Sequence, residues 1–167
     1  MSSLQVDSIS SMGGGHVDGA GLVVQCVLTT STTNTSSGAT GWVANTILDT
    51  SFTPKFSNSL IIVEVNLQIN FASLVNSTGA GGAVRIKSGS NVIGGNPSSM
   101  LESFYTRTAS SSAGAQLYSR LAKTAQDTSG GTGARTYSFE VQMDSGTSVF
   151  GVSAVSPSTM KITEYAQ

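Results

Sequence analysis

Residue types that could do chemistry are scarce and scattered in this sequence. It contains one histidine, His16, one cysteine, Cys26, and nine acidic residues. A metal site needs several converging ligands, and His16 has no second histidine or cysteine beside it, so only a three-fold axis that gathers copies of His16 would make one. Cys26 alternates with Val24 and Leu28, which predicts a small core residue rather than a reactive thiol. The sequence therefore predicts no metal.

Paired carboxylates are the other route to catalysis, as in glycoside hydrolysis. The candidates are Asp49, Glu64, Glu102, Glu140, Asp144 and Glu164. Their spacing does not place any two of them at the required separation. Glu64 and Glu140 lie on the polar faces of expected strands, which favours solvent exposure or an interface ion pair. The run of glycines at 13–15 is not a phosphate-binding loop, because no helix follows it. We expect no catalytic residues and no cofactor.

The clearest structural element is a long strand over residues 60–71, LIIVEVNLQINF. Side chains of a strand alternate between its two faces, and here one face is wholly apolar while the other becomes polar after its first two members. This pattern is typical of an antiparallel sheet that covers a core on one side. The predicted core residues are Ile61, Val63, Val65, Leu67, Ile69 and Phe71.

Further short strands are predicted along the whole chain after residue 20. The best are residues 21–28, 41–48, 136–143, 148–155 and 159–165, with a hairpin around residues 88–90 and another strand within 100–108. Residues 115–124 suit either a helical turn or a strand. Residues 29–40, 72–82 and 126–133 are expected to be loops. Eight or nine short strands with regular turn signals predict an all-β fold, an antiparallel β-sandwich of the jelly-roll type.

The composition argues against nucleic acid and membranes as partners. Only 10% of the residues are charged and the net charge is −1, whereas soluble proteins average about 25% charged residues. Nucleic-acid binding needs clustered Lys and Arg, and an anionic membrane surface attracts the same residues. No apolar run is long enough to span a bilayer, and the N-terminus has no secretory pattern. We expect neither nucleic-acid binding nor membrane insertion.

Residues 1–20 are set apart from the domain expected over residues 21–167. They contain a weakly alternating stretch with Leu4, Val6 and Ile9, followed by the glycine joint at 13–15. Triple glycine cannot hold regular structure cheaply. We interpret this region as an extended docking arm, with a disordered tail as the alternative.

Several segments together resemble the appendage proteins of tailed bacteriophages, especially marine and cyanobacterial phages. They are LQVDSIS, GGGHVDGAG and GLVVQCVLTT at the start, DTSFTPKFSNSLIIVEVNLQI around Phe52 to Val65, ARTYSFEVQM, and STMKITEYAQ with Ile162, Glu164 and Gln167. The resemblance covers most of the chain, departs from the family in the loops between residues 72 and 135, and brings no catalytic residue. It implies a trimeric β-sandwich head located on the virion and assembled in the host cytoplasm.

The expected function is that of a non-enzymatic virion protein: a homotrimeric knob on a tail or head fibre that contacts the host surface. The arm reaches at most roughly 70 Å if extended, so it would dock on a capsid, tail or fibre protein. A capsid decoration protein and a small glycan-binding, lectin-like module are the alternatives. A host glycan or protein would meet the surface loops, for which we select Asn34, Asn76, Asp127 and Thr132.

Overall fold

The computed structural model describes residues 21–73, 80–93, 102–106, 116–143, 148–152 and 156–167, and these residues form β-strands without any helix. The strands are β1 (Val23–Ser31), β2 (Thr35–Ser37), β3 (Val43–Phe52), β4 (Leu60–Ser73), β5 (Ala80–Ser88), β6 (Asn91–Ile93), β7 (Glu102–Thr106), β8 (Gln116–Thr128), β9 (Arg135–Met143), β10 (Ser148–Val152) and β11 (Ser158–Tyr165).

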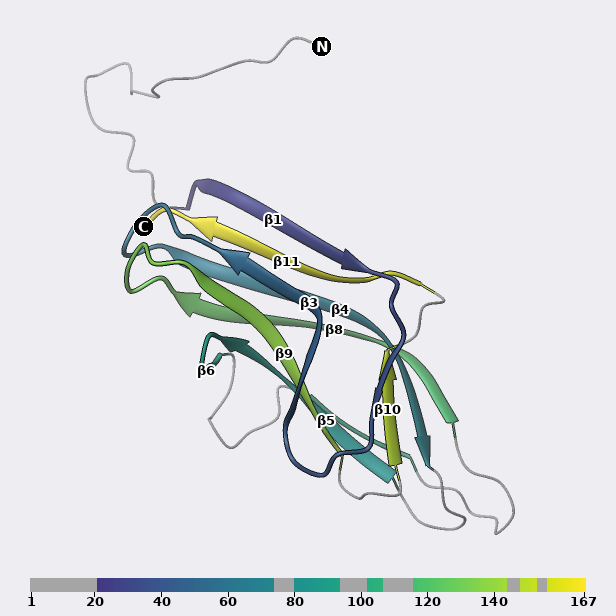
Figure 1. Cartoon of the computed structure of the whole chain (residues 1–167). Coiled ribbons are helices and arrows are strands. Elements are labelled where there is room, and N and C mark those ends of the chain that lie inside the picture. The colour runs from purple at the N-terminus through teal and green to yellow at the C-terminus, as the bar shows by residue number, and fades with distance from the viewer. Residues whose placement is uncertain (1–20, 74–79, 94–101, 107–115, 144–147, 153–155) are drawn as a thin grey trace, which may run out of the picture.

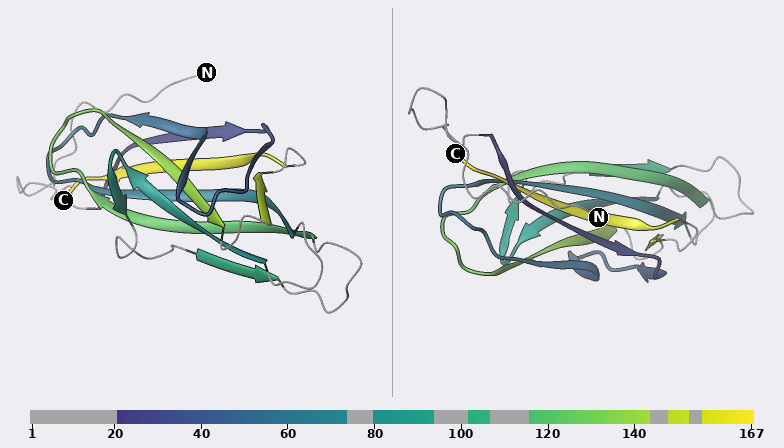
Figure 2. Two further views of the ribbon diagram at one scale, coloured as in Figure 1. Left: turned by 60° about the horizontal axis from the view of Figure 1, so that its bottom comes forward. Right: turned by 90° about the horizontal axis from the view of Figure 1, so that it is seen from above.

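The strands form two antiparallel sheets stacked as two layers (Figures 1 and 2). One sheet has six strands in the order β1-β11-β4-β10-β2, with β8 on the other edge of β4; the other has five in the order β3-β9-β5-β6, with β7 also pairing with β5. Because β11 and β10 share one edge of β4, and β6 and β7 share one edge of β5, each sheet is only about four strands wide. The predicted all-β sandwich is confirmed.

The core lies between β4 and β9, the two strands with the strictest alternation. The inward residues of β4 from Ile61 to Ile69 are at most 3% exposed, and those of β9 from Tyr137 to Met143 are at most 1% exposed. Phe52 packs edge-to-face on Tyr137, with ring centroids 6.1 Å apart, an arrangement that aromatic pairs prefer. The predicted core positions are confirmed, except that the side chain of Phe71 lies outside the described part.

Several ambiguous or loop-like segments turn out to contain strands. Residues 115–124, which suited a helical turn or a strand, fall almost wholly in β8, which pairs with β4 from Leu60 to Ala72. The three expected loops are wrong in part. Residues 29–40 contain the end of β1 and all of β2, residues 72–82 contain the end of β4 and the start of β5, and residues 126–133 contain the end of β8. The hairpin at 88–90 is confirmed, and Gly89 turns it at a φ of 58°, a left-handed conformation that glycine adopts without steric cost.

The prediction that Cys26 is a core residue is wrong. Cys26 is exposed and Leu28 is 62% exposed. The register shifts between Val23 and Gln25 where β1 pairs with β11, and the half-buried positions of β1 include Gln25, Val27 and Thr29. Gln25 is partly buried because its amide has specific acceptors beside the core, as described below. Cys26 and Leu28, which were expected in the core, therefore lie on the outer surface, and Val27 packs against the core instead.

The core assignment predicts that Val65→Asp removes the folded state. Val65 is 3% exposed in the central strand, and an unpaired carboxylate there has no compensating partner. We expect the free energy of unfolding to fall by at least about 4 kcal/mol, measured by urea unfolding followed by circular dichroism. Gln126→Asp, at an exposed position of the neighbouring strand β8, is the control and should change it by about 0.5 kcal/mol or less. A Val65→Asp protein with the parental midpoint would contradict the assignment.

Candidate functional site: the outer face of the six-stranded sheet

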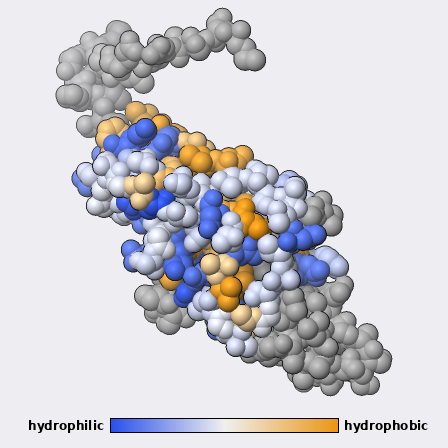
Figure 3. Space-filling model, in the orientation of Figure 1, coloured by the Kyte–Doolittle hydropathy of each residue, from blue (hydrophilic) through white to orange (hydrophobic). Residues whose placement is uncertain are grey.

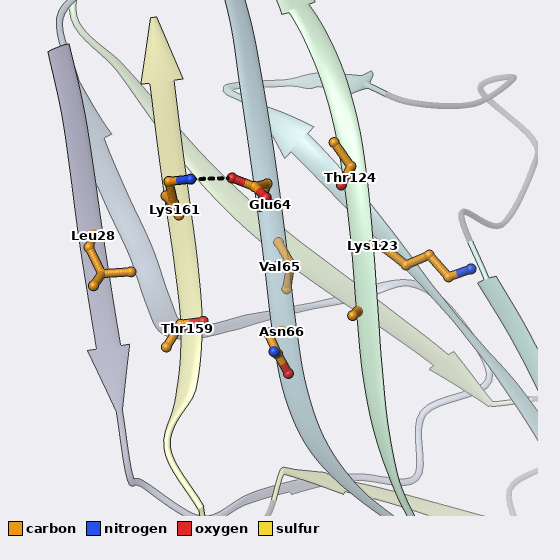
Figure 4. A pocket seen from close by; sticks show the side chains of 9 residues that line it. Leu28, Glu64, Val65, Asn66, Lys123, Thr124, Thr159 and Lys161 are labelled. Carbon is orange, nitrogen blue, oxygen red and sulfur yellow. Dashed lines mark hydrogen bonds and ion pairs between the residues drawn. The ribbon is translucent and has the colours of Figure 1, made fainter. Parts of the chain in front are cut away.

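The outer face of the six-stranded sheet presents side chains in rows across β1, β11, β4 and β8. One row contains Leu28, Lys161, Glu64 and Thr124, and Figure 4 shows these side chains on one face. Lys161 Nζ donates a hydrogen bond to Glu64 Oε2 at 2.7 Å, and both side chains are almost half exposed. Such exposed pairs stabilise a fold little, but this one cancels the two charges within the row.

An apolar depression lies at the end of this face where β4 begins and β11 ends. It has a volume of about 540 Å³ and is lined by Gly21, Leu60, Ile62, Tyr165, Ala166 and Gln167. Hydrogen bonds from Gly21 N to Ala166 O (2.7 Å) and from Ala166 N to Leu22 O (3.0 Å) hold its rim. Gly21 adopts a φ of 84°, which favours glycine there. Every lining side chain is uncharged, so the depression suits an apolar or aromatic group.

Exposed apolar residues continue from the depression along β1. Leu22 is 48% exposed, Val23 is 58% exposed and Leu28 is 62% exposed. In Figure 3 hydrophobic residues gather along the upper margin of the molecule, where Figure 1 places β1. Apolar residues gathered at one site, unlike single exposed ones, mark an interaction surface.

At the same end of the sandwich, the carboxylate of Glu164 organises the turn over residues 53–59. The Glu164 side chain is fully buried. Its oxygens accept hydrogen bonds from the backbone N–H groups of Lys55 (2.9 Å) and Phe56 (3.2 Å) and from Ser59 Oγ (2.5 Å). Gln25 Nε2 donates to Glu164 at 2.6 Å and to Thr53 O at 2.8 Å. Among the described residues, no lysine or arginine side chain bonds to Glu164, so uncharged donors from the turn and β1 compensate the charge.

Hydrogen bonding outweighs burial in setting the ionisation of Glu164. Burial alone would raise the pKa of this carboxyl, but hydrogen bonds from Ser59, the Lys55 N–H, Gln25 and the Phe56 N–H hold the pKa below its ordinary value. The bonded anion therefore fixes the backbone on either side of Phe56, whose own side chain is 54% exposed. A rigid turn thus presents an aromatic ring to solvent.

Glu140 lies on the outer face of the other sheet, in an intrachain cluster. Arg85 Nε donates to Glu140 Oε2 at 2.6 Å and Lys87 Nζ to Oε1 at 3.1 Å, while the Arg85 guanidinium lies 4.3 Å from the centre of the Trp42 ring. Burial alone would raise the pKa of Glu140, but hydrogen bonds from Lys87 and Arg85 lower it. Glu140 is only 8% exposed, so solvent exposure was the wrong expectation. Because Glu64 lies on the opposite outer face, these two carboxylates cannot act as a catalytic pair.

Asp127 was selected as a loop residue, and that assignment is wrong. It belongs to β8, where it opposes Ile61. Its Oδ2 accepts a hydrogen bond from the hydroxyl of the buried Tyr137 at 2.7 Å and lies 3.5 Å from Arg135 Nη1. Arg135 also donates to the carbonyl oxygens of Ser129 and Gly131. Asp127 therefore closes the β8–β9 connection from inside and is not presented to a partner.

The remaining selected positions do not form one site. Asn34 and Thr132 are exposed in the connections over residues 32–34 and 129–134. Thr128 opposes Leu60, which opposes Tyr165, so the connection holding Thr132 lies at the end with the depression; β1 leads away from that end to Asn34. The two loops are therefore at opposite ends of the sandwich. The other selected residues, Leu4, Val6, Ile9 and Asn76, lie outside the described residues.

The outer face presents an apolar depression, exposed apolar residues and one ion pair. In the described part of the chain, no group of three or more His, Cys, Asp or Glu side chains gathers as a metal site would require. That part also contains no helix long and apolar enough to cross a membrane. Sequence analysis missed the depression and the role of Glu164. The exposed Phe56 beside Pro54 was the one available signal, because a large apolar residue in a turn has no core to enter.

Comparison with models of known protein families found no match for this chain, and comparison with curated proteins found none either.

The hydrogen bonds to Glu164 predict that Glu164→Gln lowers the free energy of unfolding. The new amide would direct its N–H groups at the N–H donors of Lys55 or Phe56, so we expect a cost of about 1–3 kcal/mol at pH 7. Because the folded pKa lies below the ordinary 4.5, the stabilisation is complete above that value and is lost as pH falls through the folded pKa. Glu164→Gln should remove this dependence.

Urea unfolding between pH 3 and pH 7 measures both effects. Glu64→Gln is the matched control, since the described partner of Glu64 is Lys161 in a half-exposed pair, and this variant should unfold much as the parent does at neutral pH. Equal losses in the two variants would show that Glu164 has no special role.

Proposed function

We propose that this chain is a non-enzymatic structural protein of a tailed-bacteriophage virion, a homotrimeric knob on a tail or head fibre whose distal loops contact the host surface. The proposal combines the resemblance of the sequence to phage appendage proteins with the geometry of the domain. Its docking arm is the segment with Leu4, Val6 and Ile9, which would join another virion protein by adding to the edge of a sheet.

One observation supports the proposal most strongly: three segments that carry the resemblance meet at one carboxylate. Gln25 comes from the segment GLVVQCVLTT, residues 53–59 come from DTSFTPKFSNSLIIVEVNLQI, and Glu164 comes from STMKITEYAQ. In the sequence, Gln25 and Glu164 are 139 positions apart, yet they are hydrogen-bonded partners. The resembling residues are therefore the ones that fix this end of the sandwich, which is what a shared architecture requires.

The placement of the arm attachment and the Asn34 loop at opposite ends of the domain suits such a knob. The chain enters the sandwich at Gly21, beside the depression, whereas the connection holding Asn34 lies at the opposite end. An arm attached at the first end would leave the second end facing outward. Loops carried on a rigid scaffold are where binding usually occurs. A capsid decoration protein would use the same arm, and the position of the domain in a density map of the intact particle separates the two roles.

Deleting residues 1–12 tests the docking arm. We expect the truncated chain to stay folded and soluble, with the unfolding midpoint of the full chain, and to be missing from purified particles assembled in its presence. Particle composition is measured by mass spectrometry against the full-length chain. Incorporation of the truncated chain at the parental level would contradict the arm.

Replacing residues 32–34 with Gly-Ser-Gly tests the distal loop. We expect host attachment of the assembled particle to fall at least about tenfold, because truncating a few contact residues commonly removes most binding energy. The same replacement at residues 132–134, at the arm end, is the matched control and should leave attachment unchanged. If both variants attach normally, the distal loop does not bind the host and the decoration role is favoured.

A further inference from the structure

The sandwich carries a protruding aromatic residue and an apolar depression at the same end. Phe56 is 54% exposed, and it is not among the residues that line the depression. Its backbone is fixed by the hydrogen bond from its N–H to Glu164 Oε1 at 3.2 Å and by the bonds from Lys55 N to the same carboxylate. A ring held on a rigid turn loses little conformational freedom when it binds.

The depression has the character that a phenyl ring needs. Leu60, Ile62 and Tyr165 supply apolar and aromatic surface, and the volume of about 540 Å³ is ample for one side chain. The lining side chains carry no charge, and the nearest row beyond them holds its Glu64 and Lys161 charges in a pair. No side-chain charge in this lining therefore opposes the approach of a second copy.

A protrusion and a complementary depression at different places on one molecule make a heterologous contact, which closes into a ring when the rotation between copies allows it. We propose that Phe56 of one copy inserts into the depression formed by Gly21, Leu60, Ile62 and Tyr165 of the next copy, and that three such contacts close the trimer. This inference rests on the proposed trimeric knob and names the surface through which its copies meet. Aromatic residues seated in a pocket near the centre of an interface are its usual hot spots.

Two complementary variants test the contact. Phe56→Asp removes the protrusion and Ile62→Lys blocks the depression, so each alone should be monomeric, with self-association weakened at least about 30-fold as expected for a hot spot. Mixed in equal amounts, they should form a dimer and no larger species, because one intact protrusion meets one intact depression. Light scattering after size-exclusion chromatography measures the mass of each species.

Matched controls separate assembly from folding. Val43→Asp places the same charge at another exposed apolar position, 39% exposed at the start of β3, and should remain trimeric. Circular dichroism and thermal unfolding check every variant; if Ile62→Lys does not fold, the milder Leu60→Ser/Ile62→Ser variant replaces it. Cys26, the only cysteine of the chain, lies across Thr163 from Ile62, so a fluorophore on it reports docking at the depression.

The outcomes are distinct. A trimeric parent, monomeric single variants and a dimeric mixture support the contact. A parent that stays monomeric overturns the trimer of the proposed function together with this contact. A trimeric parent whose Phe56→Asp and Ile62→Lys variants are also trimeric, or whose variants do not combine, overturns the contact alone. If deleting residues 1–12 makes the protein monomeric while Phe56→Asp leaves it trimeric, the N-terminal segment occupies the depression instead.

Discussion

The structure depends on one buried anion that has no cationic side chain among its described partners. Glu164 is fully buried at the end of the core, and donors from β1, from the turn before β4 and from Ser59 compensate its charge. An unpaired buried carboxylate would cost far more than one domain's stability margin allows, so all of these donors must be in place together. The anion thereby makes the first strand, the turn and the last strand a single cooperative unit.

The chain has few charged residues, and several of them form ion pairs with one another. Glu140 binds Arg85 and Lys87, Asp127 lies beside Arg135, and Glu64 binds Lys161. These pairs reduce the charge that the domain presents to other molecules, and hydroxyl and amide groups supply much of its remaining polar surface. Association through such a surface depends on shape and apolar contact and responds weakly to ionic strength.

The sequence predicted the elements whose two faces differ in polarity. In β4 and β9 every second residue is apolar, and burial follows that period; a helix would have spread the same residues around its circumference. The pattern failed in β1, where Gln25 turns toward the core and Cys26 and Leu28 face outward. The cause is the hydrogen bond from Gln25 to Glu164, 139 positions away, which no local period encodes. Asp127 was misplaced for a related reason, because its partners Arg135 and Tyr137 belong to the next strand.

The position of β11 has a consequence for how the protein is made. This last strand lies between β1 and β4, and β1 pairs with no other strand in the described part of the chain. During translation β1 lacks this partner until β11 leaves the ribosome, while the long edge of β4 that will receive β11 stays open. Such a topology of distant pairings folds slowly, and this sheet can be completed only after β11 has been synthesised. The nascent chain is consequently exposed to aggregation through these open strand edges until β11 has emerged.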